Sequence, residues 1–103
     1  MLNYFILKER VRLEITYVKV HRIERENSRM KGIATIKLDD QIAIHDIRII
    51  QGDERLFVAM PSRRTATGEH RDAVHPLNKE TREMFEKAIL DEYEKQEEEG
   101  TEE

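Results

Sequence analysis

The residues best suited to chemistry in this chain are arginines gathered in one stretch. The segment from Arg55 to Arg71 holds four arginines against a single carboxylate, Glu69, so its local charge is +3. The four are Arg55, Arg63, Arg64 and Arg71. A guanidinium group presents a planar fork of N–H donors that matches phosphate oxygens, and the hydroxyls of Ser62 and Thr65 can donate to the same groups. The segment therefore predicts phosphate recognition and, through it, nucleic-acid binding.

A structural interpretation of the same arginines stays open. Carboxylates lie close to them in the sequence, at Asp53, Glu54, Glu69 and Asp72. Ion pairs on the surface would neutralise the arginines and leave no site for a ligand. Only the folded arrangement separates the two interpretations.

No catalytic or metal-binding set accompanies the arginines. His45 and Asp46 are adjacent, and neighbours on a strand point to opposite faces, so they do not form a hydrogen-bonded catalytic pair. His45, His70 and His75 with an aspartate are a conceivable zinc site, but their spacing matches no common ligand set. The chain has no cysteine, and its four glycines are isolated rather than grouped in a phosphate loop. We expect no enzyme activity, no metal and no cofactor.

Length and composition limit the class of protein further. The chain has 103 residues and a net charge of −4, which fits one small domain with a thin core and favours self-association. The charge is uneven, at +2 for residues 1–12, +1 for 13–75 and −7 for 76–103. No apolar run approaches the roughly 18 residues that a membrane span needs, so no membrane partner is expected. The lack of cysteine is consistent with a reducing cytoplasm, where we expect the protein to act.

The elements that must position the arginines are mainly β-strands. Nine of the eleven isoleucines lie between Ile15 and Ile50, and isoleucine favours strands. The expected strands are Leu13 to Ile23, Ile33 to Leu38, Ile42 to Ile50 and Leu56 to Met60. Short polar turns separate them, at residues 26–29, 39–40 and 51–54. Tight turns between consecutive strands predict an antiparallel meander.

Side chains alternate between the two faces of a strand, and in two of the expected strands this alternation predicts which side chains face the core. In the first strand, apolar residues at 13, 15 and 17 lie on one face and Val18 and Val20 on the other, so the strand is either covered on both sides or shifted by a bulge. In the third strand, strict alternation predicts that Arg48 shares a face with Ile44.

After the strands the sequence loses its apolar residues and then takes on a helical pattern. Residues 61–76 are almost free of apolar side chains and are expected to form a loop longer than most compact domains tolerate without a use. Asn78 offers an N-cap, and Phe85, Ile89 and Tyr93 recur at helical spacing. An amphipathic helix is therefore expected from Asn78 to about Lys95, packed on the sheet.

The C-terminal end is acidic. Gln96 to Glu103 holds five glutamates and nearly no apolar residue, which predicts a disordered tail. A mobile acidic tail of this kind would compete with nucleic acid for the arginine patch.

Several blocks of residues resemble one known family. The blocks are Ile44-His45-Asp46-Ile47-Arg48, Leu56 through Thr65, Gly68-Glu69, Arg71-Asp72 and Ala73 through Asn78. In this order and with these small gaps, they closely resemble the stage V sporulation protein G family over about residues 13–93. The resemblance implies a small bacterial α+β protein that forms homodimers, binds DNA and RNA, and regulates processes tied to septum formation and sporulation, without enzyme activity.

The resemblance also singles out two residues. The basic pair after the Met-Pro-Ser segment is associated with nucleic-acid binding in that family, and here the pair is Arg63 and Arg64. Arg71, Arg55 and Arg48 are added on electrostatic grounds, Arg48 on the condition that its strand face looks toward the loop.

The expected domain organisation is a family-like domain over residues 13–95, an N-terminal extension over 1–12 and the acidic tail over 96–103. Chains of the family usually begin near the position of Leu13, so the extension has two explanations. Either the codons of Lys8-Glu9-Arg10 form a ribosome-binding site and translation starts at Val11 or Leu13, or the segment is genuine and docks Tyr4 to Leu7 on the sheet or on a second chain.

The combined expectation is an α+β homodimer, each chain with a meander of about four strands and one C-terminal helix, that regulates septation by binding DNA and RNA. A rival interpretation is a protein-interaction regulator of septation whose arginine loop docks an acidic protein partner.

Overall fold

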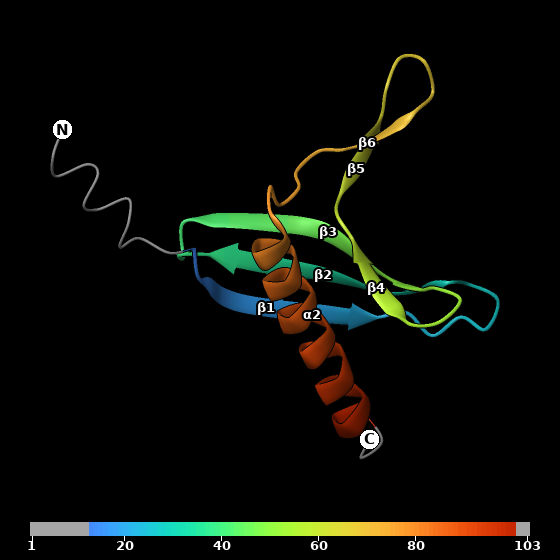
Figure 1. Ribbon diagram of the computed structural model, residues 1–103. Helices are drawn as coiled ribbons and strands as arrows, with labels where there is room; N and C mark the ends of the chain where they lie inside the picture. The colour runs from blue at the N-terminus through green and yellow to red at the C-terminus, as the bar shows by residue number, and fades with distance from the viewer. Residues whose placement is uncertain (1–12, 101–103) are drawn as a thin grey trace, which may run out of the picture.

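Four antiparallel strands in the order β1-β2-β3-β4 form the sheet that carries the rest of the molecule (Figure 1). The computed structural model describes residues 13–100, so the expected extension of residues 1–12 and residues 101–103 lie outside it. The strands are β1 (Ile15–Arg22), β2 (Met30–Leu38), β3 (Ile42–Gln51) and β4 (Leu56–Ala59). A separate hairpin of β5 (Ser62–Arg64) and β6 (His70–Asp72) follows, and then the helix α2 (Lys79–Gly100). The predicted antiparallel meander is confirmed.

The turn between β2 and β3 shows why consecutive strands pair. Asp39 and Asp40 both have a φ of 53°, and the N–H of Gln41 donates to the carbonyl of Leu38 at 2.9 Å. Two central residues with positive φ make a type I′ turn, whose twist matches that of the flanking strands. Aspartate adopts this left-handed conformation more readily than most residues. The turn predicted at these two aspartates is therefore present, and it brings β2 and β3 into register.

A bulge in β3 makes the predicted alternation of that strand wrong. The register on β2 shifts at His45 and Asp46, which together lie opposite the single residue Thr35. Asp46 has a φ of 61°, and the extra residue reverses the phase of all that follows. As a result Ile44 is buried, whereas Arg48, predicted on the same face as Ile44, lies on the opposite face of the sheet.

A second bulge decides between the two alternatives left open for β1. The register on β2 shifts between Ile15 and Tyr17, and Tyr17 then pairs with Lys37. Beyond the shift, Val20 is buried under α2, and Tyr17 and Lys19 lie on the other face. The strand is shifted by a bulge rather than covered on both sides.

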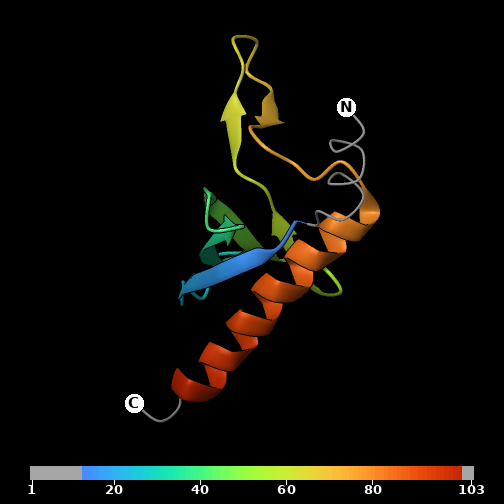
Figure 2. The ribbon, with the colours of Figure 1, turned by 90° about the vertical axis from the view of Figure 1, so that its left-hand side faces the viewer.

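One face of the sheet holds the core. The helix α2 packs across β1 and β4 on this side (Figure 2). The buried apolar residues are Val20, Ala34, Ile36, Leu38, Ile44, Ile47, Ile49, Val58 and Met60 from the sheet side, and Phe85, Ile89 and Tyr93 from α2. No described helix or strand packs across the opposite face, which we call the open face. Its residues, from the cross-strand pairing, are Tyr17, Lys19, His21, Ile33, Thr35, Lys37, Ala43, His45, Arg48, Ile50, Phe57 and Ala59.

The helix begins as predicted and runs further than predicted. The N–H of Thr81 donates to Oδ1 of Asn78 at 2.8 Å, which is an N-cap bond. The helix continues to Gly100, five residues beyond the predicted end near Lys95, and the disorder predicted for the acidic tail stays a prediction. Glutamate is a good helix former, and extending a helix that packing has already nucleated costs little. Within residues 13–100 no helix combines the length and the apolar composition that a membrane span requires.

A polar contact supplements the apolar packing of α2. Arg22 on β1 donates through Nη1 to the backbone carbonyl of Tyr93 at 2.8 Å and through Nη2 to the Tyr93 hydroxyl at 3.1 Å. Its guanidinium carbon also lies 3.9 Å from the centroid of the Tyr93 ring, within the range of a cation–π interaction. One arginine thus ties both the backbone and the side chain of α2 to the edge of the sheet.

Candidate nucleic-acid interface

The segment predicted as a loop, residues 61–76, contains a β-hairpin, which we call the arm and define as residues 61–73. Its cross-strand pairs are Ser62 with Asp72, Arg63 with Arg71, and Arg64 with His70. At its base the N–H of Ala73 donates to the carbonyl of Pro61 at 2.7 Å. The arm extends away from the sheet (Figures 1 and 2). The loop prediction is wrong for these strands because their pairing uses backbone groups, and their polar side chains reflect only their exposure.

The arm carries cations on both of its faces. Residues directly opposite each other in an antiparallel pair share a face, so Arg63 and Arg71 lie on one face and Arg64 and His70 on the other. All four residues are exposed. Like charges placed opposite each other destabilise a hairpin. An anion bound between Arg63 and Arg71 would remove that cost.

Ion pairs neutralise little of this charge. Nη2 of Arg71 lies 3.8 Å from Oε2 of Glu69, with 71% and 67% of the two side chains exposed, and an exposed pair of this kind contributes little. Among the described residues, no carboxylate pairs with Arg63 or Arg64. The surface ion-pair interpretation therefore does not account for these two arginines.

Thr65 organises the tip of the arm. Its N–H donates to the carbonyl of Glu69 at 2.7 Å, and its hydroxyl oxygen accepts from the N–H of Glu69 at 3.2 Å. The same hydroxyl lies 3.0 Å from Oγ1 of Thr67. Gly68, with a φ of 91°, supplies the left-handed residue that the turn requires. Thr65, predicted to donate to phosphate, thus uses its hydroxyl within the tip and positions the two strands that carry the arginines.

Arg48 links the open face to the root of the arm. Its Nη2 lies 3.4 Å from both the carbonyl oxygen of Met60 and Oγ of Ser62, as donor to each. The bulge at Asp46 turns Arg48 to the open face, so the condition set for Arg48 from the sequence is met. Ser62, a further candidate, accepts this bond at the first position of β5.

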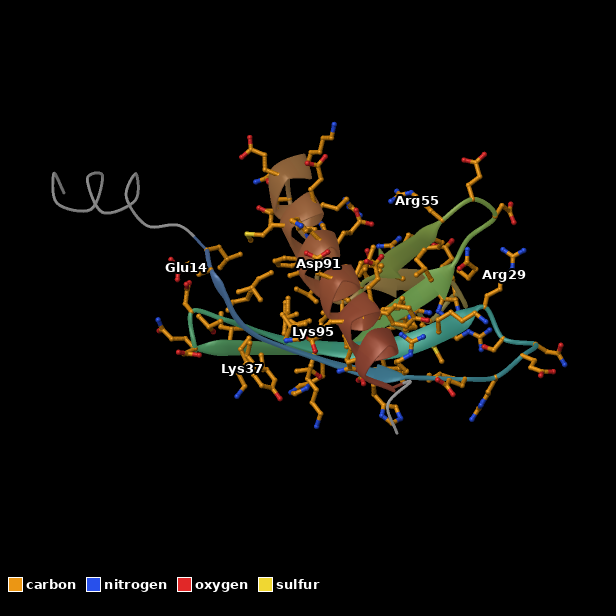
Figure 3. The ribbon with its side chains drawn as sticks, turned by 90° about the horizontal axis from the view of Figure 1, so that it is seen from below. Glu14, Arg29, Lys37, Arg55, Asp91 and Lys95 are labelled. Atoms are coloured by element: carbon orange, nitrogen blue, oxygen red, sulfur yellow. The ribbon has the colours of Figure 1, made fainter. Side chains whose placement is uncertain are left out.

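Arg55 lies apart from the other candidates. It precedes β4, at the end of that strand opposite the arm, where its carbonyl accepts from the N–H of Gly52 at 2.8 Å. Figure 3 shows Arg55 at the same end of the sheet as Arg29, whose Nη2 lies 3.2 Å from Oδ1 of Asp53. The four residues of β4 separate Arg55 from the arm, at roughly 3.3 Å for each residue.

His70 is an arm residue that the sequence-based list of candidate site residues omitted. It lies opposite Arg64 in the arm and adds a hydrogen-bonding ring to that face. A signal was present in the sequence, because Thr67 lies midway between Arg64 and His70 and is followed by Gly68, a turn-forming residue. A hairpin centred on Thr67 would have paired Arg64 with His70.

The histidines weighed for zinc do not form a cluster. Among residues 13–100 no three histidine, aspartate or glutamate side chains are placed to share a metal ion. His45 instead lies with Nδ1 3.2 Å from Oγ1 of Thr35 on the open face.

The fold and the arm together define a small α+β protein whose basic two-stranded arm stands clear of its core. The residues that form this fold are nearly the same residues that match one protein family. The chain belongs to the SpoVG family, whose family model matches residues 13–95. The family resemblance predicted from the sequence blocks is confirmed.

Relatives with the name "Putative septation protein SpoVG" match most of the chain. The protein of Clostridium novyi is 49% identical over 82 residues, which cover 80% of this chain and 81% of the relative. A protein of Clostridium perfringens is 49% identical over 83 residues, covering 81% and 91%. A protein of Lachnospira eligens is 44% identical over 85 residues, covering 82% and 96%. The relatives are named for septation and not for a catalysed reaction.

Proposed function

We propose that this protein is a cytoplasmic, non-enzymatic regulator that binds DNA and RNA and acts in septum formation and sporulation control. The observation that carries nucleic-acid binding is the arm, an exposed hairpin with Arg63, Arg64 and Arg71 on two faces. Arginine forks match phosphate oxygens, and an exposed position lets them reach a ligand without moving the core. The names of relatives 44–49% identical support the link to septation.

The shape of the arm suits a nucleic-acid groove. The major groove of B-form DNA is about 12 Å wide and admits a two-stranded β-ribbon. A hairpin inserted tip first has one sugar-phosphate wall on each side. Arg63 and Arg71 would then face one wall, and Arg64 and His70 the other. Cations on both faces are therefore useful in a groove, whereas a flat phosphate surface would engage only one face.

The net negative charge of the chain does not oppose this function strongly. The acidity is concentrated in residues 76–103, at −7, and α2 runs away from the arm, so its acidic C-terminal half lies far from the arm tip (Figure 1). At physiological salt the Debye length is about 8 Å. The carboxylates of Asp91, Glu92 and Glu94 in that half are thus screened from phosphates bound at the arm.

The active form in this proposal is a homodimer. Among the described residues β1 and β4 are sheet edges with unpaired backbone groups, and a partner strand at such an edge would pair them. Leu77, beyond the arm, is 89% exposed. Sedimentation equilibrium should give twice the 12.3 kDa chain mass at the concentrations used for binding. A mass of one chain there would remove this part of the proposal.

A second candidate is an arm that docks an acidic protein partner, with nucleic-acid affinity incidental. It is favoured by the lack of Phe, Tyr or Trp in residues 61–73, because base-stacking proteins usually present aromatic rings. Salt dependence does not separate the two candidates, since both are electrostatic.

Selection from randomised DNA and RNA pools at physiological salt separates them. We expect the full chain to enrich particular sequences, because a regulator must discriminate among targets. Equal affinity for every sequence, lost near physiological salt, would instead favour the acidic protein partner.

A further inference from the structure

The open face carries cations that lie outside the arm. Lys19 on β1 pairs with Thr35, which is two residues along β2 from Lys37. Diagonal neighbours of this kind are about 7–8 Å apart, and both lysines are exposed. Figure 3 shows the Lys37 side chain on the side of the sheet opposite α2. Arg48, on the same face, extends the row of cations toward the root of the arm.

Almost no negative charge offsets these cations. The four strands of the sheet contain a single carboxylate, Asp46 in the β3 bulge. Within residues 13–100 the other acidic residues lie before β1, in the segments between the strands, in the arm and in α2. The open face is therefore a basic surface of an acidic protein.

An apolar strip lies beside the cations. Ile33 pairs with Arg48, and Phe57 pairs with Ile50 on the next strand pair. The three apolar residues Ile33, Ile50 and Phe57 are only partly buried. A planar apolar group could lie on them while a charged backbone follows the cations.

We propose that the open face binds single-stranded nucleic acid, with phosphates on Lys19, Lys37 and Arg48 and bases on the strip that contains Phe57. The inference rests on the proposed nucleic-acid function and adds to the arm a second surface, joined to it through Arg48. Bases in a duplex are stacked on one another, so only a single strand offers free base faces to an aromatic ring.

Charge argues against a second copy of the chain as the occupant of this face. An isologous interface through the open face would place the basic surface that carries Lys19 and Lys37 against the same basic surface of its partner. No carboxylate other than Asp46 is present in β1 to β4 to compensate. A polyanion meets the face with the opposite charge instead.

The test compares two double variants with the same change in net charge. One is Lys19→Ala with Lys37→Ala on the open face, and the control is Lys79→Ala with Lys87→Ala on α2, where both lysines are also exposed. The probes are a polythymidine oligonucleotide and a duplex of equal length. Thermal unfolding of each variant checks folding, since Lys37 also lies 4.6 Å from the Tyr17 ring centroid.

We expect the open-face variant to bind the single strand about tenfold or more weakly. Its salt slope should fall by about 1.4, because each phosphate contact on a single strand contributes about 0.7. Duplex binding, which uses the arm, should change no more than in the control. Equal losses in both variants would overturn the open-face site while leaving the arm intact, whereas failure of the unaltered chain to bind either probe would overturn the proposed function as well.

Acetylation of lysines in the unaltered chain gives a second measurement that does not depend on variants. Lys19 and Lys37 should be protected by polythymidine, and Lys79 and Lys87 should not. The hydrogen bond to Asp91, together with the charge of that carboxylate, raises the pKa of Lys87, so each lysine is compared with itself with and without the oligonucleotide. Protection of Lys19 and Lys37 that grows with protein concentration alone would show that a second copy covers the face and would overturn the proposal.

Discussion

Replacing Arg63 and Arg64 together by alanine should weaken binding to duplex DNA by about 100-fold. Both arginines are exposed on the arm, and no described carboxylate neutralises them. A charge-assisted hydrogen bond contributes roughly 1.5 kcal/mol at least, and two such contacts correspond to about two orders of magnitude in affinity. The slope of log K against log salt should also fall by about 1.8, since each duplex phosphate contact contributes about 0.9.

A matched control separates this loss from a general effect of charge. Arg25→Ala with Arg82→Ala removes two other exposed arginines, one from the segment after β1 and one from α2. The control should bind duplex DNA nearly as well as the unaltered chain. A loss as large in the control as in the arm variant would mean that net charge, and not the arm, determines binding.

The arm variant should remain as stable as the unaltered chain. Surface substitutions usually change the free energy of unfolding by less than about 0.5 kcal/mol, and Arg63→Ala also relieves the repulsion between Arg63 and Arg71 in their cross-strand pair. Unchanged thermal unfolding with lost binding would assign the loss to the site itself.

Ile89→Ala should lower the free energy of unfolding by about 2–5 kcal/mol. Ile89 is fully buried where α2 meets the sheet, and the helix is held there by its apolar stripe and by the contact of Arg22 with Tyr93. Truncation would remove buried methyl and methylene groups and leave a cavity that the strands cannot fill, because their pairing fixes the backbone. Chemical denaturation followed by circular dichroism measures the effect.

Two further variants test whether the loss of stability depends on how much buried apolar volume is removed. Ile89→Val should cost only about 0.5–1.5 kcal/mol, and Ile42→Ala, at a position 60% exposed, should cost little. If Ile42→Ala destabilised the protein as much as Ile89→Ala, something would cover Ile42 in solution. Duplex binding by Ile89→Ala should persist below its unfolding temperature, because α2 packs mainly on β1 and β4 and the arm extends away from the sheet (Figure 1).

The sequence by itself determined the types of most elements and the chemistry of the arm. Asp39 and Asp40 fix a turn through their tolerance of positive φ, and Asn78 caps α2 through its own side-chain oxygen. Signals of this kind act over a few residues, so they are visible without the fold. The basic pair Arg63 and Arg64 needed only residue type and spacing to be recognised.

Tertiary structure decided which of the candidate cations lie together. One extra residue at Asp46 turns Arg48 to the open face, and a strand periodicity cannot reveal it because the bulge depends on pairing with β2. Arg55 is closer in sequence to Arg63 than Arg48 is, yet β4 carries it away from the arm while Arg48 reaches Ser62. Strand register is set by contacts between residues distant in the chain, so the open face and its link to the arm exist only once the sheet has formed.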